Sequence, residues 1–349
     1  MKKFKRIREW MDIPGRFQPG TYNRITDVPG ISVGHCTIIE EKHVRTGVTI
    51  IKPHPGDLYH QPVPCAIYKA NGYGKLTGSI QVEELGVLES LIGLTNTLSV
   101  CQVTQGILNY HVPFMRYGEN SINVLVGETN DGCINDIKGF HVRPEHVQQA
   151  ISNLGPEVQE GCVGAGTGTM CYGYKGGIGT SSRIVPGTTI GEKEDYTIGA
   201  LVQTNFGGNL NIYGTLIQHN ELQSVEIKGS CMIILATDAP MDARLLHRLA
   251  KRGIVGMTNT GSYLSNGSGD FCIAFSNCKE NIPQDGWHRK TTFTCLDDGQ
   301  MNPFFEAAAE TVQEAIYNSL TMARDMEAAD GRFVKAFNIE DFRDKLTLK

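Results

Sequence analysis

Apolar and polar residues follow one another in short blocks along this chain, and Gly, Pro, Asn and Asp separate the blocks. Apolar or alternating blocks at residues 25–38, 45–53, 195–207, 231–236 and 271–276 predict β-strands, and a further strand begins near Gly177. Apolar residues spaced three and four apart predict helices over 87–110, 143–154, 242–252 and 303–327, and a break near Thr95–Thr97 is an alternative for the first of them. The chain therefore contains both strands and helices in quantity.

The block Cys231–Ala236 is the most continuous apolar run of these strands and is long enough for a buried one. Asp238 follows it, with Pro240 close behind, which predicts a helix start with Asp238 as the N-cap. The next helix is predicted to stop at Gly253. A hydroxyl residue, Ser230, stands immediately before the run, so it is expected at the head of a core strand.

Gly229 precedes this serine and, as a glycine, can adopt backbone angles that would bring the Ser230 hydroxyl against the Gly229 carbonyl. Attack of that hydroxyl on the carbonyl would cut the chain and leave Ser230 with a free α-amine. An α-amine has a pKa of about 7.7 to 8.0 and can act as general base for its own hydroxyl. An ordinary Gly-Ser turn explains the same residues, and this stretch alone favours the turn.

Polar residues at two other strand ends are candidates for substrate contacts. The strand predicted at Ile122–Val126 runs into Glu128, Thr129 and Asn130, where charged and amide groups meet substrates in layered α/β proteins. A turn that only caps the strand explains these residues equally well. The strand over 195–207 delivers Asn205, whose NH2 group can stabilise a developing oxyanion.

Ser268 and Asp270 lie in a turn-rich run that leads into the strand Phe271–Ser276. Their i, i+2 spacing places them on the same side of an extended chain. A carboxylate behind a serine can orient a hydrogen-bond chain to a nucleophile, as the third member of a catalytic triad does.

Composition narrows the function further. The formal charge of −5 leaves no basic footprint for nucleic acid. The first residues lack the apolar run of a signal peptide and no stretch reaches the length of a membrane span, so we expect no membrane partner and a cytoplasmic protein.

Two observations argue against bound groups, and a third argues against a cysteine nucleophile. The ten cysteines and ten histidines form no metal-ligand spacing, so no metal is expected. The Gly-rich segment 161–183 lacks both the dinucleotide fingerprint and a G-K-[ST] phosphate loop, so no cofactor is expected either. Cys171, within that segment, has no base supplied by the sequence and is predicted to be a buried cysteine.

Several motifs in fixed order support a resemblance that spans nearly the whole chain. DVPGISVGH, GETNDGCINDI, GAGTG followed by CYGYKGGIGTSSR, GALVQTNFG, KGSCMIILATDAP and TGSYLSNGSGDFCIAFS resemble the L-aminopeptidase/D-esterase and β-peptidyl aminopeptidase family. That family is similar to the N-terminal-nucleophile hydrolases, so the resemblance implies an α/β fold, a four-layer αββα sandwich. It also implies a single domain over residues 1–349 that cuts itself into 1–229 and 230–349, without a cofactor, and assembles as a homo-oligomer of two-chain units.

The resemblance also assigns roles to individual residues. It implies Gly229–Ser230 as the cleavage bond and Ser230 as nucleophile, which reverses the preference for a simple turn. Ser268 and Asp270 become its supporting hydroxyl and carboxylate, and Asn205 the oxyanion donor. Glu128, with Asn130 beside it, becomes the anion that receives the free amine of a small peptide or amino-acyl amide or ester. Tyr and Glu also occur in the family at the positions of Asn130 and Asp270.

Two other functions remain open at this level. The ornithine acetyltransferase family shares the fold and the self-cleavage but transfers an acetyl group and usually has a threonine as nucleophile, so Ser230 argues against it. A sandwich that binds small ligands without catalysis would leave the Gly229–Ser230 bond uncut.

Overall fold

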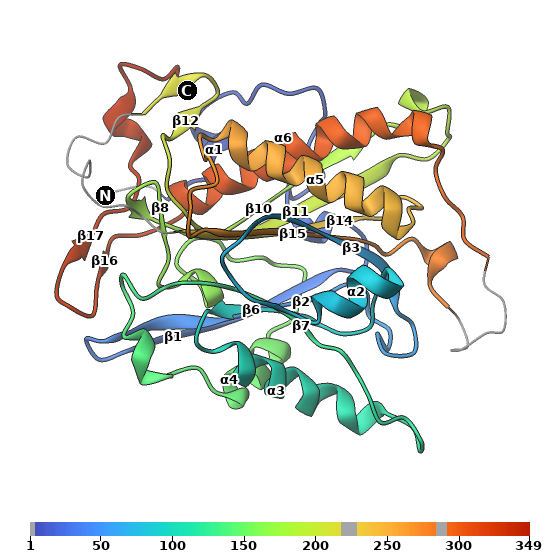
Figure 1. Ribbon diagram of the computed structural model, residues 1–349. Helices are drawn as coiled ribbons and strands as arrows, with labels where there is room; N and C mark the ends of the chain where they lie inside the picture. The colour runs from blue at the N-terminus through green and yellow to red at the C-terminus, as the bar shows by residue number, and fades with distance from the viewer. Residues whose placement is uncertain (1–3, 218–228, 284–291) are drawn as a thin grey trace.

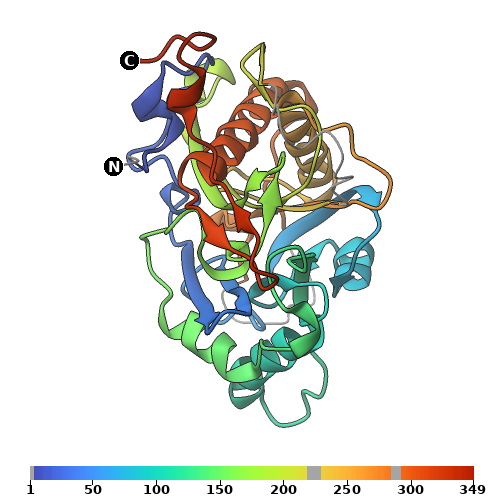
Figure 2. The same ribbon diagram turned by 90° about the vertical axis from the view of Figure 1, so that its left-hand side faces the viewer.

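Two stacked β-sheets, each covered by helices on its outer face, form the body of the protein (Figure 1). A computed structural model describes residues 4–217, 229–283 and 292–349. Helices α5 and α6 cover one sheet, and α3 and α4 cover the other; the view turned by 90° shows the same four layers (Figure 2). The four-layer αββα sandwich implied by the resemblance is therefore confirmed.

The first sheet has the strand order β10-β11-β14-β15-β3-β5, with bounds Gly177–Val185, Tyr196–Asn205, Ser230–Thr237, Gly269–Ser276, Val63–Gly72 and Val87–Leu88. The second sheet has the order β1-β2-β6-β7-β4, with bounds Ser32–Glu40, Val44–Lys52, Ile92–Asn96, Leu125–Thr129 and Leu76–Thr77. Short pairs are β8 with β9 (Met170–Cys171, Tyr174–Lys175), β12 with β13 (Asn211–Ile212, Thr215–Leu216) and β16 with β17 (Met326–Glu327, Phe333–Val334). The helices are α1 (Ile7–Trp10), α2 (Ser79–Leu85), α3 (Val100–His111), α4 (Pro144–Ser152), α5 (Ala243–Asn259) and α6 (Met301–Thr321).

Strand β14 occupies the centre of the first sheet and is buried at every position. Successive side chains on a strand point to opposite faces. Met232 and Ile234 accordingly join the apolar cluster between the sheets, while Ile233 and Leu235 join the cluster under α5 and α6. This packing on both faces explains the unbroken apolar run seen in the sequence.

The helix predicted over 87–110 is wrong in its first half. Residues Ile92–Asn96 form β6, which lies between β2 and β7 in the second sheet, and the helix begins only at Val100. A short apolar run buried on both faces has the same pattern whether it is a strand or a helix, so the pattern alone could not distinguish them.

The predicted ends of the helix after β14 are also wrong. The N-cap is Asp242, whose carboxylate accepts the Leu245 N–H at 2.8 Å, whereas Asp238 accepts the Thr197 N–H. Gly253 does not stop the helix, which continues to Asn259. A Cβ at Gly253 would lie 2.8 Å from the Cys272 sulfur, so this glycine allows α5 to pack closely on the sheet.

A buried ion cluster fixes α6 to the first sheet. The Arg183 guanidinium on β10 is fully buried and donates to Glu314 at 2.7 Å and to Glu310 at 3.0 Å. Arg8 reaches the same Glu314 carboxylate at 2.8 Å. Burial alone would raise the pKa of Glu314, but the two arginines hold that pKa below its ordinary value.

Candidate active site at the head of strand β14

Ser230, Gly229 and Gly269 meet where β14 and β15 begin side by side. The Ser230 hydroxyl donates to the Gly229 carbonyl oxygen at 2.7 Å. The Gly269 N–H points at the same place, 3.3 Å from the Gly229 oxygen and 3.4 Å from Ser230 Oγ. The hydroxyl is therefore held against the carbonyl of its own preceding residue, with a backbone donor beside both atoms.

Gly229 is a glycine for a reason other than the one predicted. Its φ is not in the left-handed region. Instead, a Cβ at this position would lie 2.4 Å from the Phe206 Cα and 2.7 Å from the Asn205 carbonyl oxygen. The end of β11 therefore passes so close to Gly229 that no side chain fits.

Ser268 and Asp270 are in contact, as their spacing predicted. The Ser268 hydroxyl donates to Asp270 Oδ1 at 2.9 Å, while the buried Oδ2 has no partner among the described residues. Burial raises the pKa of Asp270 to about 6, although the Ser268 hydroxyl and the Cys231 N–H favour its charged form. The second oxygen is thus free to receive a further donor.

Asn205 lies directly opposite Ser230 in the β11–β14 ladder. Its Oδ1 accepts the Met170 N–H at 2.9 Å, and its Nδ2 donates to the Asn130 carbonyl oxygen at 2.9 Å. An amide nitrogen carries two hydrogens, so one remains for another acceptor. These two contacts fix the orientation of the amide beside the nucleophile candidate.

Glu128 lies within β7, because the strand covers Leu125–Thr129 and not 122–126 as predicted. Its carboxylate is buried, and Oε1 accepts the Lys75 N–H at 2.9 Å. Burial raises the pKa of Glu128, whereas the Lys75 N–H and ammonium act in the opposite direction. A buried carboxylate attracts a cation strongly, and the Lys75 ammonium already lies 3.9 Å from Oε1.

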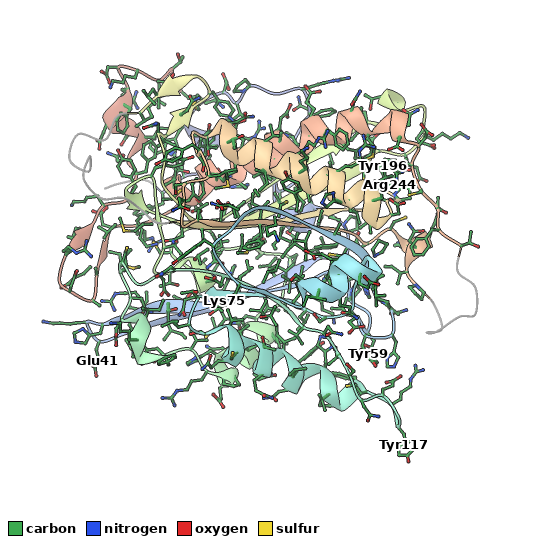
Figure 3. All side chains as sticks on the ribbon, in the orientation of Figure 1. Glu41, Tyr59, Lys75, Tyr117, Tyr196 and Arg244 are labelled. Atoms are coloured by element: carbon green, nitrogen blue, oxygen red, sulfur yellow. The ribbon has the colours of Figure 1, made fainter. Side chains whose placement is uncertain are left out.

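One turn between the sheets links Glu128 to the head of β14. A Cβ at Gly74 would lie 3.2 Å from Glu128 Oε1 and 3.4 Å from the Gly269 Cα. Only the backbone of Gly74 therefore lies between the Glu128 carboxylate and Gly269, the residue that pairs with Ser230. Lys75, the next residue, lies at the level between the two sheets (Figure 3).

Asn130 is exposed, and its side chain only closes a turn by accepting the Gly132 N–H at 2.9 Å. Its backbone oxygen is the atom that holds Asn205. The substrate-binding role that the resemblance implied for the Asn130 side chain stays a prediction, as do the roles of the other site residues.

The sequence interpretation missed Lys175, a fully buried lysine that pairs with Met170, the residue whose N–H contacts Asn205. Its ammonium donates to the Gly166 carbonyl at 3.0 Å and to the Gly176 carbonyl at 2.7 Å. Burial lowers its pKa, and the Cys162 thiol and Asp131 nearby oppose that shift. The signal that could have found it is the presence of a lysine in the most glycine-rich segment of the chain. Neighbouring glycines have no side chains that could contact its ammonium group, so backbone carbonyls must do so.

The structure also shows the state of the cysteines and of the potential metal ligands. Cys171 is fully buried, as predicted, and burial raises the pKa of its thiol to about 12. Across residues 4–217, 229–283 and 292–349 no cluster of His, Cys, Asp and Glu is arranged to hold a metal ion. All ten cysteines are free.

Comparison with known proteins identifies the family. The model of peptidase family S58 matches residues 23–334. The chain belongs to peptidase family S58. It is similar to the β-peptidyl aminopeptidase BapA of Sphingosinicella microcystinivorans, with 35% identity over 92% of this chain and 87% of that protein.

Two solved structures agree with this assignment. A protein of Pyrococcus horikoshii OT3 superposes with a TM-score of 0.89 and 43% identity over 95% of both chains. The L-aminopeptidase D-Ala-esterase/amidase of Ochrobactrum anthropi superposes with a TM-score of 0.89 and 34% identity over 98% of both chains. That enzyme is described as a variant of the N-terminal-nucleophile hydrolase fold, which is therefore also the fold of this S58 chain. In the described part of the chain, no helix is long and apolar enough to cross a membrane.

Proposed function

We propose that this S58 protein is a self-processing serine aminopeptidase that releases N-terminal residues from small peptides, amides or esters. The observation that carries the proposal is the 2.7 Å contact between Ser230 Oγ and the carbonyl oxygen of Gly229. Membership of a peptidase family and similarity to two named aminopeptidases support peptide hydrolysis over acetyl transfer and over ligand binding without catalysis.

In the processing step, a bond forms between Ser230 Oγ and the Gly229 carbonyl carbon, and the bond from that carbon to the Ser230 nitrogen breaks. The hydroxyl proton ends on the nitrogen. The Gly269 N–H, 3.3 Å from the carbonyl oxygen, stabilises the negative charge that develops there. Water then hydrolyses the ester, which leaves a Gly229 carboxylate on fragment 1–229 and a free amine on fragment 230–349.

In turnover, the new α-amine of Ser230 accepts the hydroxyl proton while Oγ attacks the substrate carbonyl. Asn205, opposite Ser230, donates its remaining amide hydrogen to the oxyanion. The proton passes to the leaving amine, and water releases the acyl group from Ser230. Asp270, through Ser268, balances the charge of the Ser230 amine.

Glu128 selects the substrate. Its buried carboxylate receives the free amine of the substrate, and Gly74 sets the short separation between that carboxylate and the head of β14. An N-acylated substrate has no ammonium group to offer, so the carboxylate would keep only its long contact with the Lys75 ammonium, at 3.9 Å, which is less favourable. This preference makes the enzyme an aminopeptidase rather than a general amidase.

The test begins with the purified protein on a denaturing gel. We expect two fragments, 1–229 and 230–349, with Ser230 as the first residue of the smaller one by terminal sequencing. Ser230→Ala should remain a single inactive chain, and Ser152→Ala, which removes an exposed hydroxyl on α4, serves as its control. A wild-type chain that stays intact after long incubation would refute self-processing. Size-exclusion chromatography with light scattering of the same sample tests the homo-oligomer of two-chain units.

A further inference from the structure

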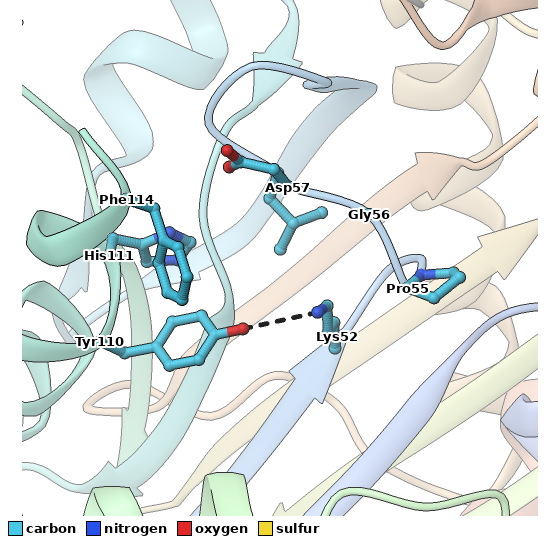
Figure 4. Close-up of a pocket in the computed structure, with 8 residues that line it drawn as sticks. Lys52, Pro55, Gly56, Asp57, Tyr110, His111 and Phe114 are labelled. Atoms are coloured by element: carbon cyan, nitrogen blue, oxygen red, sulfur yellow. Dashed lines mark hydrogen bonds between the residues drawn. The ribbon is translucent and has the colours of Figure 1, made fainter. Parts of the chain in front are cut away.

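A cavity of mixed polar and apolar lining lies near the end of β14 that is opposite to Ser230. Its volume is about 210 Å³, and its walls come from the end of β2, the loop after it, the last turn of α3 and the 3-10 turn that follows α3. Figure 4 shows Lys52 and Tyr110 on one side and Asp57 on another.

The location follows from the contacts of Asn277. Its N–H donates to the carbonyl oxygen of Thr237, the last residue of β14, and its side chain donates to Pro53, next to Lys52. Thr237 lies seven positions along β14 from Ser230, which corresponds to roughly 23 Å at about 3.3 Å per residue. Tyr59, in the cavity's loop, and Lys75, near the head of β14, lie well apart in Figure 3. The cavity is therefore separate from the candidate active site.

Lys52 supplies a positive charge without a negative partner. Its ammonium contacts the Tyr110 hydroxyl at 3.4 Å and makes no ion pair within the described ranges. A half-buried ammonium in this state attracts an anion, because the surrounding protein screens charge less well than water does.

His111 adds a hydrogen-bond donor on the same wall. The ring is buried, and its Nε2 accepts the Leu91 N–H at 3.1 Å. Burial lowers the pKa of His111 to about 4, so the ring is neutral at pH 7 and carries its proton on Nδ1. No acceptor for that proton exists among the residues the structure describes, and His111 lines the cavity.

Asp57 supplies the opposite charge at the cavity's edge. Its carboxylate accepts the Tyr59 N–H at 3.1 Å and contacts His60 Nδ1 at 2.6 Å. His60 in turn contacts Glu119 at 3.0 Å, so two carboxylates share one imidazole and this edge stays negative even when His60 is protonated. A carboxylate has about four acceptor sites, so Asp57 can still receive an ammonium group.

We propose that this cavity binds a free amino acid with a small apolar side chain. The carboxylate of the ligand lies against Lys52, Tyr110 and His111, and its ammonium group faces Asp57. Leu58, Pro55 and Phe114 supply the apolar wall. A cavity of about 150 Å³ holds benzene, so one of this size holds a molecule of roughly six to nine heavy atoms, the range from β-alanine to leucine. Binding here does not require that the protein cleave peptides.

Calorimetric titration with L-valine tests the site, in a Glu128→Gln background that removes the candidate ammonium partner near Ser230. We expect saturable binding with one ligand per chain, weakened at least tenfold by Lys52→Met. Lys52→Arg, which keeps the charge, and Lys42→Met, which removes an exposed charge elsewhere, should both retain binding. Isovalerate and isobutylamine, which carry only one of the two charges, should bind at least tenfold more weakly than valine.

A second variant protects the test against misfolding. Phe114 is 57% exposed, so Phe114→Ala leaves the core intact but removes part of the apolar wall. It should weaken valine binding several-fold with an unchanged melting temperature. Absence of saturable valine binding in the Glu128→Gln background would overturn the proposal, as would equal affinity in Lys52→Met. Neither result bears on the cleavage of Gly229–Ser230.

Discussion

Ser230 and Gly269 face each other in parallel register at the first positions of β14 and β15, and the Gly269 N–H lies within 3.4 Å of both Ser230 Oγ and the Gly229 oxygen. The nucleophile candidate therefore takes its position from the sheet. A residue in a ladder between two buried strands cannot shift without breaking the hydrogen bonds on both sides. The geometry at the Gly229–Ser230 bond is consequently sensitive to small changes of backbone position.

Gly229→Ala should block processing. The new Cβ would lie 2.4 Å from the Phe206 Cα, so the backbone must move away and carry the Gly229 carbonyl from the hydroxyl. We expect a mostly uncut chain, measured by denaturing gel. Gly155→Ala is the control, because a Cβ there meets nothing within 4 Å. Complete processing of Gly229→Ala would show that this close contact does not control the reaction.

Ser268→Ala and Asp270→Asn should slow turnover, because both remove the hydrogen-bond chain beside Ser230. We expect kcat to fall about 100-fold in Ser268→Ala, about 2.7 kcal/mol in barrier height, and less in Asp270→Asn if the carboxylate only orients. Steady-state kinetics on an amino-acyl p-nitroanilide measures both. A near-normal kcat in Ser268→Ala would remove Ser268 from the mechanism.

The ionisation of Asp270 should appear in the pH dependence of processing. Burial raises its pKa to about 6 in the uncut chain, so the carboxylate is charged above that pH and protonated below it. The charged carboxylate accepts from and orients the Ser268 hydroxyl next to the cleavage site, so the rate of self-cleavage should fall as pH drops through about 6, in freshly synthesised precursor sampled over time. Asp270→Asn should be slower and should lack this step in its profile; the same step in that variant would assign the titration to another group.

Glu128→Gln should abolish the preference for a free amine. The wild-type protein should cleave an amino-acyl p-nitroanilide with a kcat/KM far above that of its N-acetyl form, because only the free amine can pair with the buried carboxylate. In Glu128→Gln the first value should fall at least tenfold, about 1.4 kcal/mol, while the second changes little. Equal cleavage of both substrates by the wild-type protein would contradict the aminopeptidase assignment.

Lys175→Met should lower kcat with little change in KM. The variant leaves the Gly166 and Gly176 carbonyls without their donor, at about 1–3 kcal/mol for each buried group. Met170, paired with Lys175 across the β8–β9 hairpin, donates the N–H that orients the Asn205 amide. Lys138→Met, at an exposed lysine, is the control. A lower melting temperature with unchanged kcat would reduce Lys175 to a purely structural residue.

Glu314→Gln should destabilise the fold far more than Glu306→Gln on the same helix. Glu314→Gln leaves the buried Arg183 without its charged partner on Glu314, which lowers the free energy of unfolding by about 3–5 kcal/mol. The exposed ion pair of Glu306 with Arg16 contributes only about 0–1 kcal/mol. Urea unfolding in the uncut Ser230→Ala background measures both. The pKa of Glu314 is lowered in the fold, so its contribution is present above the ordinary value of about 4.5 and is lost as pH falls through the lower folded pKa. Equal effects of the two substitutions would refute this account.

The sequence predicted the central strand and the contact of Ser268 with Asp270, because both depend on local spacing. It placed Asn205 at the end of a strand, which is where the structure has it. It could not show that Asn205 lies opposite Ser230, since that depends on strand order. Glu128 was expected after its strand and lies within it; a shift of three residues in the strand explains the difference.

The errors have physical causes as well. Ile92–Asn96 was predicted as helix because burial on both faces removes the alternation that identifies a strand. Asp238 and Asp242 are both suitable helix caps, and only the tertiary contact of Asp238 with Thr197 decides between them. Lys175 and Gly74 act through close packing of distant segments, which no local pattern records.

The position of β14 between β11 and β15 affects how a cleaved molecule would stay folded and how it would refold. Ladder contacts on both sides would hold the new amino terminus in place after scission, so the two fragments would remain together as one body. Once denatured, however, they would have to find each other in solution, and recovery of the native state would depend on concentration. The mature protein would then owe its persistence to slow unfolding rather than to reversible folding.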